Sequence, residues 1–206
     1  MKKFMFSIGL ILFACEATHT QLSQKKLVGG GCEGCELIFE GMPSALSWHT
    51  TMVESKEPGE PLIIDGTIYQ KDGRTLAANV ILYVYHTDNN GLYSPSNNQT
   101  IAKRHGHLRG WMKTDAQGRY QFRTIRPKAY PNANIPAHIH PVIKEQDRNE
   151  YYIDDLQFED DPLLTNEVRL KEAKRGGGGI ISLTKNANGE WIGRRDIILG
   201  LNIPNY

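Results

Sequence analysis

Two histidines separated by one residue, His138 and His140, are the side chains of this sequence best spaced to bind a metal ion. Successive side chains of a β-strand point to opposite faces, so residues i and i+2 face the same way, roughly 6.5–7 Å apart. Two imidazoles at that spacing can bind one ion, and neutral imidazole suits zinc, copper, iron or nickel. The alternative interpretation is two polar residues on the outer face of a strand.

A tyrosine lies close to this pair: Tyr130 precedes it in an Arg-Pro-Lys-Ala-Tyr-Pro stretch. Phenolate is a hard anionic oxygen that favours a highly charged ion such as Fe(III). Because the pKa of tyrosine is normally about 10, it binds at neutral pH only where a strong Lewis acid lowers that pKa. If a second tyrosine from farther upstream joins the site, the donor set indicates ferric iron. Alone, Tyr130 could equally be a packed core residue.

The elements that must position these residues are short and rich in β-branched and aromatic side chains. Turn residues separate them at regular intervals, and helical periodicity is modest and confined to residues 163–174. This pattern predicts an all-β fold, an antiparallel β-sandwich with little helix. The predicted strands are residues 62–69, 78–86, 110–114, 119–125, 135–144, 180–184 and 191–199, with a hairpin turn at 186–189.

The N-terminus has the features of an export signal over residues 1–14: Lys2 and Lys3 precede an apolar stretch too short to span a bilayer comfortably. The stretch Leu-Phe-Ala-Cys that ends at Cys15 resembles a bacterial lipobox. We therefore expect an exported protein, in the periplasm or at the outer membrane or cell surface, with a lipid on Cys15 as its sole membrane contact. Cleavage without lipidation, near Ala14 or Ala17, is the alternative.

Residues 15–58 are expected to form a tether and an ordered N-terminal arm, and residues 59–206 the sandwich domain. Cys32 and Cys35 lie in the arm, where an oxidising compartment favours a disulfide between them. The alternatives are a redox pair or half of a zinc site with His49. With 206 residues and a net charge of +1, the chain offers no electrostatic basis for binding nucleic acid.

The body of the chain, over about residues 62–165, resembles the intradiol ring-cleavage dioxygenases, enzymes that cut catechols between their two hydroxyls. The resemblance is carried by Pro-Ala-His-Ile-His at 136–140, by the stretch around Tyr130, by Asn-Gly-Leu-Tyr-Ser at 90–94 and by Phe-Glu-Asp-Asp-Pro at 158–162. It implies a transthyretin-like (prealbumin-like) sandwich in which Tyr93, Tyr130, His138 and His140 bind one Fe(III).

The resemblance also implies a reaction, in which a catechol-type substrate and O2 yield a muconate-type diacid and Tyr130 acts as both ligand and base. Two alternatives stay open. The chain could be a relative that binds metal but is catalytically altered, or a non-catalytic transthyretin-like binding module.

The chain departs from the family pattern around the expected site. Ile135 occupies the position of a family arginine, and Asp155 occupies that of a glutamine. Changes in the groups that support metal ligands can cost 10–100-fold in affinity or activity. Arg109, Arg126 and Arg148 are the candidates to supply the missing charge. A second His-x-His pair, at His105 and His107, is interpreted as loop residues.

Overall fold

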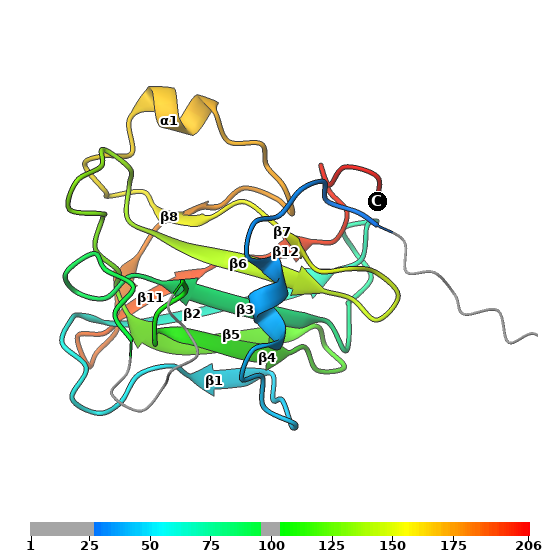
Figure 1. The fold of residues 1–206 in the computed structure, drawn as a ribbon, viewed down its shortest axis with the longest axis horizontal. Helices are drawn as coiled ribbons and strands as arrows, with labels where there is room; N and C mark the ends of the chain where they lie inside the picture. Colours follow the sequence, from blue (N-terminus) through cyan, green and yellow to red (C-terminus); the bar gives the residue numbers. More distant parts are fainter. Residues whose placement is uncertain (1–26, 96–103) are drawn as a thin grey trace, which may run out of the picture.

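Two six-stranded β-sheets form the framework of the part of the chain that the computed structural model describes, residues 27–95 and 104–206 (Figure 1). They stack as a sandwich, so the predicted fold class is confirmed. The predicted export signal and the lipidation site at Cys15 lie outside the described residues. Within the described residues, no helix has the length and apolar character that crossing a membrane requires.

The first sheet is built around two long antiparallel strands, and short strands extend it on both sides. Its order is β1 (His49–Thr51), β5 (Arg119–Ile125), β2 (Pro61–Tyr69), β11 (Trp191–Arg194) and β10 (Thr184–Lys185), with β12 (Ile197–Ile198) also paired to β2. Strands β2 and β5 are antiparallel, whereas β1, β11 and β12 join them in parallel. The sheet is therefore mixed, because the arm and the C-terminal segment add parallel strands to an antiparallel centre.

The second sheet carries the predicted histidines. Its order is β4 (Arg109–Lys113), β3 (Ile81–His86), β6 (His138–Lys144), β8 (Leu156–Phe158) and β9 (Ile180–Ile181), with β7 (Tyr151–Tyr152) also paired to β6. The predicted strand at 78–86 begins later than expected, because Asn79 has a positive φ of 61°. The predicted hairpin at 186–189 is confirmed, since β10 and β11 pair in antiparallel fashion around it.

Helix is scarce, as predicted, and α1 (Asn166–Leu170) covers only part of the expected 163–174 segment. Thr165 caps its N-terminus, with its hydroxyl accepting a bond from the Val168 amide. None of its residues is buried, and Leu170 is 87% exposed. In Figure 1, α1 lies at the periphery, away from the two sheets. Without an apolar face to bury, the segment gains little from a longer helix.

Alternation along the strands divides the second sheet into a core face and an outer face. Leu82 and Val84 point into the core between the sheets, whereas Tyr83 and Tyr85 lie on the outer face. Directly paired residues share a face, and Tyr85 pairs with His140. The register of β3 against β6 thus places His140 on the outer face, outside the apolar core.

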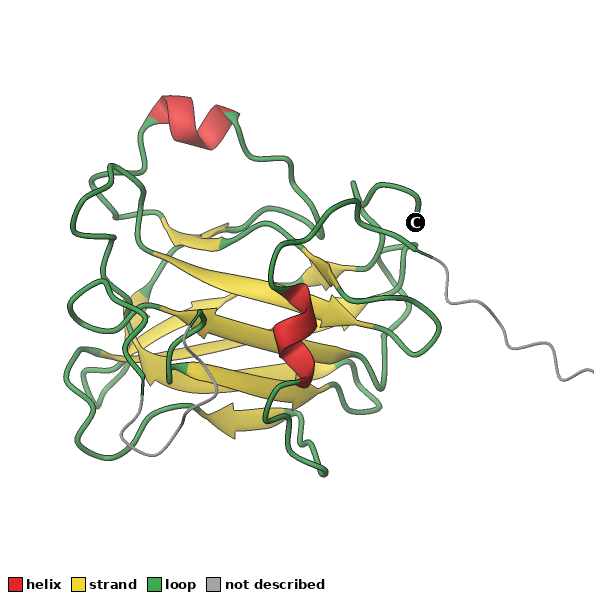
Figure 2. Cartoon of the chain, in the orientation of Figure 1, coloured by secondary structure: helices red, strands yellow, loops and turns green. Residues whose placement is uncertain are grey.

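The first part of the predicted arm lies on this outer face, whereas its later residues supply β1 to the first sheet. Its 3-10 helix η1 (Cys35–Phe39) crosses the front of the second sheet, red in Figure 2. Ile38 is fully buried in a small cluster with Cys35, Tyr83 and Val142. The indole of Trp111 donates to the Ile38 carbonyl at 2.6 Å. Packing therefore fixes the arm beside the histidine strand.

The two cysteines of the arm, Cys32 and Cys35, form a disulfide at the start of η1, as predicted. Among the described residues, His49 has no part in a zinc-like cluster with them, since it lies in β1 and contacts Ser47. The disulfide closes a turn at the edge of the outer face.

We expect Ile38→Ala to destabilise the protein by about 2–4 kcal/mol, because it removes a fully buried side chain and leaves a cavity. Phe39→Ala is the matched control: Phe39 is 49% exposed, and its loss should cost less than about 1 kcal/mol. Urea unfolding of the two variants measures the difference. Equal stabilities would mean that the arm does not depend on Ile38 for its docking.

Candidate metal centre

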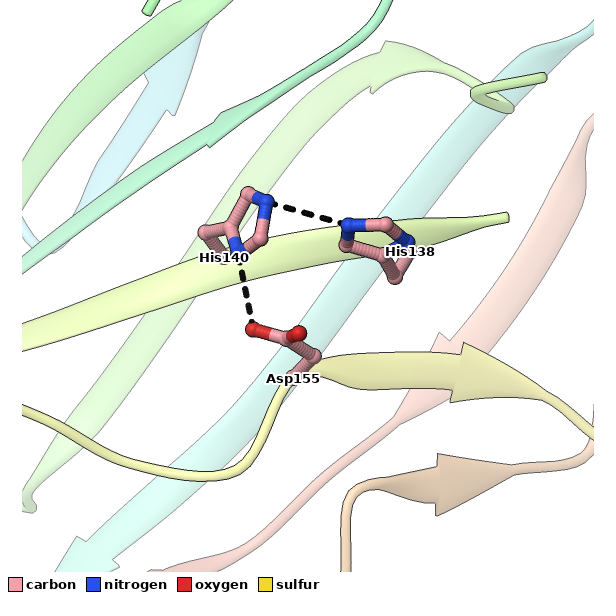
Figure 3. A group of neighbouring side chains, drawn as sticks. All are labelled: His138, His140 and Asp155. Atoms are coloured by element: carbon pink, nitrogen blue, oxygen red, sulfur yellow. Dashed lines mark hydrogen bonds and ion pairs between the residues drawn. The ribbon is translucent and has the colours of Figure 1, made fainter. Parts of the chain in front are cut away.

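The first residues of β6 bring His138 and His140 to one side of the strand (Figure 3). Their Nε2 atoms lie 3.0 Å apart, and the two rings are nearly perpendicular, at 84°. His138 is buried and His140 is partly exposed. The i, i+2 spacing therefore brings the two imidazole nitrogens to a common point.

Tyr93 and Tyr130 reach this point from two loops that are bonded to each other. The Asp88 carboxylate accepts bonds from the Leu92 amide and the Ser94 hydroxyl, which folds the loop after β3. The Thr87 hydroxyl donates to the Lys128 carbonyl at 2.6 Å, and this bond ties that loop to the Tyr130 segment. Gly91 has a φ of 75°, and a Cβ there would lie 2.2 Å from the Ala129 carbonyl oxygen. Only glycine allows the two loops to approach this closely.

The four predicted ligand atoms converge. Tyr93 Oη lies 2.6 Å from Tyr130 Oη and 2.9 Å from His140 Nε2. Tyr130 Oη lies 3.3 Å from His138 Nε2 and 3.5 Å from His140 Nε2. Oxygen and nitrogen donors placed about 2 Å from one ion are separated from each other by roughly 3 Å. The observed separations are of that size.

The far nitrogen of each imidazole is bonded to an acceptor. His138 Nδ1 lies 2.7 Å from the Pro136 carbonyl, and His140 Nδ1 lies 2.8 Å from Asp155 Oδ1 (Figure 3). A carbonyl and a carboxylate cannot donate, so each Nδ1 must carry the proton. In a neutral ring, Nε2 then presents a lone pair, and burial lowers the pKa of His138, which favours its neutral form.

Two lone pairs facing each other at 3.0 Å repel, and a cation between them would relieve that repulsion. Burial raises the pKa of both Tyr93 and Tyr130, so neither becomes a phenolate in the protein alone. A highly charged ion would supply the missing positive charge and displace the phenolic protons. The donor set therefore fits a ferric ion.

Asp155 orients His140. Burial tends to raise the pKa of this carboxyl, but the hydrogen bond from His140 and the nearby positive charges, including that of Arg195, hold it below its usual range. Asp155 could itself be counted with the two histidines as a metal-binding group, since their ligand atoms lie within 4.8 Å of one another. Its bond to Nδ1, however, is on the opposite side of the ring from Nε2, where the tyrosines converge. This contact between Asp155 and His140 was not predicted from the sequence.

None of the three candidate arginines has a described contact with the four donors. Arg126 binds the Asp160 carboxylate, Arg148 binds Glu145 and Asp147, and Arg109 lies over the Trp111 ring. Ile135, at the position of the family arginine, is 45% exposed. The cation that affects Asp155 is instead Arg195, which is buried and which sequence reasoning did not consider.

His105 lies in a loop, as predicted, but it is buried at the site and not solvated. Its ring stacks on Tyr85 with centroids 3.5 Å apart, and Tyr85 in turn stacks on His140 at 4.6 Å. His105 Nδ1 also lies 2.9 Å from the Tyr83 hydroxyl. The stack was not predicted, although strand alternation places Tyr83 and Tyr85 on one face of β3. His107, the other member of the pair, binds Glu57 and the Ser94 carbonyl.

Known proteins resemble this chain in sequence. A family model described as "Dioxygenase" matches residues 39–190. Catechol 1,2-dioxygenase 1 of Acinetobacter lwoffii is 30% identical over 131 residues, which cover 56% of this chain and 41% of that protein. The protocatechuate 3,4-dioxygenase beta chain of Burkholderia cepacia is 32% identical over 120 residues, 54% of this chain and 51% of that one. The chain thus spans about half the length of the curated relatives it matches.

Solved structures agree on the fold. The dioxygenase domain of a dioxygenase and carbohydrate-binding protein fusion from Streptomyces sp. SirexAA-E superimposes with a TM-score of 0.59 at 23% identity, covering 78% of this chain and 96% of that domain. At this identity the likeness concerns the fold alone. Because the family model matches most of the sequence, the chain belongs to the intradiol ring-cleavage dioxygenase family.

Proposed function

We propose that this protein binds one Fe(III) through Tyr93, Tyr130, His138 and His140, and that it cleaves a catechol-type diol with O2. One observation carries the proposal. Five of the six pairs among the four donor atoms lie 2.6–3.5 Å apart, and each imidazole is held by its Nδ1 with Nε2 facing the other donors. Family membership supports the reaction, in which the ring opens between the two hydroxyls and both oxygen atoms enter a muconate-type diacid.

The ferric ion, when bound, would supply Lewis-acid activation of the two catechol oxygens and a template for the reaction. The protein's own groups would orient and move protons. The Pro136 carbonyl and the Asp155 carboxylate hold the two imidazoles in the tautomer that can bind. Tyr85 fixes the plane of the His140 ring by stacking against it.

Tyr130 is the proposed base. As a phenolate, its Oη would be placed to accept a proton from a catechol hydroxyl and so become a neutral phenol. Burial raises the pKa of Tyr130, so the displaced phenol would keep that proton at neutral pH. Its hydroxyl also bonds to Tyr93 Oη at 2.6 Å, a contact that holds the phenol beside the site.

A second function has one observation in its favour, namely that none of the three candidate arginines has a described contact with the donors and that Ile135 is apolar. A protein that binds iron but turns over slowly would fit this feature.

We also propose export and lipidation at Cys15 from the sequence. The disulfide between Cys32 and Cys35 supports an oxidising compartment.

Iron binding tests the centre directly. Ferric-loaded protein should contain one iron per chain and absorb visible light through charge transfer from tyrosinate to iron. His138→Ala should weaken iron binding by more than about 100-fold, because it removes a ligand itself. Replacing a residue that only supports a ligand typically costs about 10–100-fold in metal affinity. His49→Ala, which removes an imidazole outside the site, is the control and should retain both colour and iron. A protein that stays colourless and iron-free after ferric loading would refute the proposal.

Turnover separates the two candidate functions. Oxygen uptake with catechol should consume one O2 for each diol cleaved, and Tyr130→Phe should reduce the rate by at least about 100-fold, since it removes the general base. Tyr69→Phe, in β2, is the matched control and should leave the rate unchanged. If iron binds and colours the protein but catechol produces no oxygen uptake, the protein is instead a relative that binds metal without cleaving catechol.

Asp155→Asn keeps the size of the side chain but removes the carboxylate that accepts from His140 Nδ1. We expect iron affinity to fall by about 10–100-fold, as for other groups that orient metal-binding histidines. Competition with a chelator measures the affinity. Asp154→Asn is the control, because Asp154 neighbours Asp155 without contacting either histidine in the described structure. Unchanged affinity in Asp155→Asn would mean that His140 needs no carboxylate.

A further inference from the structure

The segment that carries the second His-x-His pair, His105 and His107, lies against the backbone of Tyr93. The His107 amide donates to the Ser94 carbonyl at 3.0 Å, and His107 Nδ1 lies 2.8 Å from the same oxygen. Gly106 has a φ of 67°, and a Cβ there would lie 3.0 Å from Tyr93 Cα. The residue that follows Tyr93 is therefore bonded twice to His107.

Glu57, near the end of the predicted N-terminal arm, holds the other side of the His107 ring. Its Oε2 lies 2.9 Å from His107 Nε2, and the two side chains are only 14% and 21% exposed. The Ser94 carbonyl and the Glu57 carboxylate are both acceptors, so the ring bonds both when each of its nitrogens carries a proton. Burial tends to lower the pKa of His107, but these two acceptors raise it above its usual value.

The position of Tyr93 depends on its loop. Among the described residues, the Tyr93 hydroxyl bonds only to other members of the donor cluster. The Ser94 hydroxyl donates to the Asp88 carboxylate at 2.6 Å, which attaches the loop at one point. The Ser94 carbonyl, bonded to His107, attaches it at a second point.

We infer that His107, held by Glu57 of the arm, is a positioning residue that fixes the Tyr93 loop for iron binding. The inference rests on the proposed function, since it concerns a ligand of that centre. A ligand that is already in place when the ion arrives loses less conformational freedom on binding, so the affinity is higher. His107 acts through the backbone beside Tyr93 and does not touch the ion itself.

Two conservative substitutions separate the two bonds of the ring. The amide nitrogen of asparagine is as many bonds from Cα as Nδ1, and that of glutamine as many as Nε2. His107→Asn should therefore keep the bond to Ser94, whereas His107→Gln should keep only the bond to Glu57.

We expect His107→Ala and His107→Gln to weaken ferric iron binding by about tenfold, the low end of the loss for groups that support metal ligands. His107→Asn should recover most of this affinity. Competition with a chelator measures the affinity, and urea unfolding of the iron-free variants records their stability.

A double-variant cycle tests whether His107 acts through Tyr93. In a Tyr93→Phe background, His107→Ala should cause no further loss of iron affinity, because residues that act as a unit are not additive. In the wild-type background, His107→Ala at saturating iron should lose part of its visible absorption per bound iron, since a displaced Tyr93 contributes less charge transfer. A merely structural role would give additive losses and unchanged absorption.

Glu57→Ala should reproduce part of the loss, because it frees the His107 ring to turn away from Ser94. Glu60→Ala is the matched control. Glu60 is a nearby acid in the same stretch of sequence, but its described ion pair is with Lys185, at 3.6 Å. Its replacement should leave iron affinity unchanged.

The outcomes separate this inference from the proposed function. If the wild-type protein binds no ferric iron, the proposed function fails and this inference falls with it. If the wild-type protein binds iron and His107→Ala keeps its affinity within about twofold, a difference that independent sites also show, this inference alone is overturned. Additive losses in the double variant, or equal losses in His107→Asn and His107→Gln, would also overturn it.

Discussion

The separation of 3.0 Å between two imidazole nitrogens is the constraint on which the site depends. Each ring has its other nitrogen committed to an acceptor, so the two facing nitrogens present lone pairs to each other. A positive charge between the rings would relieve the repulsion between these lone pairs. Tyr93 and Tyr130 face the same point, and their phenolic oxygens would become strong ligands only for an ion that can displace their protons.

The sandwich fold lets the two imidazoles face each other without exposing the apolar core between the sheets. The register of β3 against β6 sets His140 beside Tyr85 on the outer face, while the alternate residues of both strands fill the space between the sheets. The tyrosines then need only two loops, which hydrogen bonds and a close approach at Gly91 hold together. The arm covers the same face through Ile38 and adds a wall beside His140.

Much of this could be predicted from the sequence, because strand alternation and turn residues are local signals. The β-sandwich and most strand positions followed from them, and the spacing of His138 and His140 predicted their shared direction. The parallel additions could not be predicted, since the pairing of β11 and β12 with β2 depends on contacts between distant segments. The role of Asp155 also needed the fold: it is 15 residues from His140 in sequence, and only the pairing of β6 with β8 brings the two together. The same holds for the stacking of His105 on Tyr85.

The most direct test of the account is the position of the iron in crystals of the ferric-loaded protein, located by anomalous scattering at the iron absorption edge. We expect a single peak about 2 Å from Tyr93 Oη, Tyr130 Oη, His138 Nε2 and His140 Nε2. A peak bound to the Asp155 carboxylate in place of the tyrosines, or no peak between the two histidines, would contradict it.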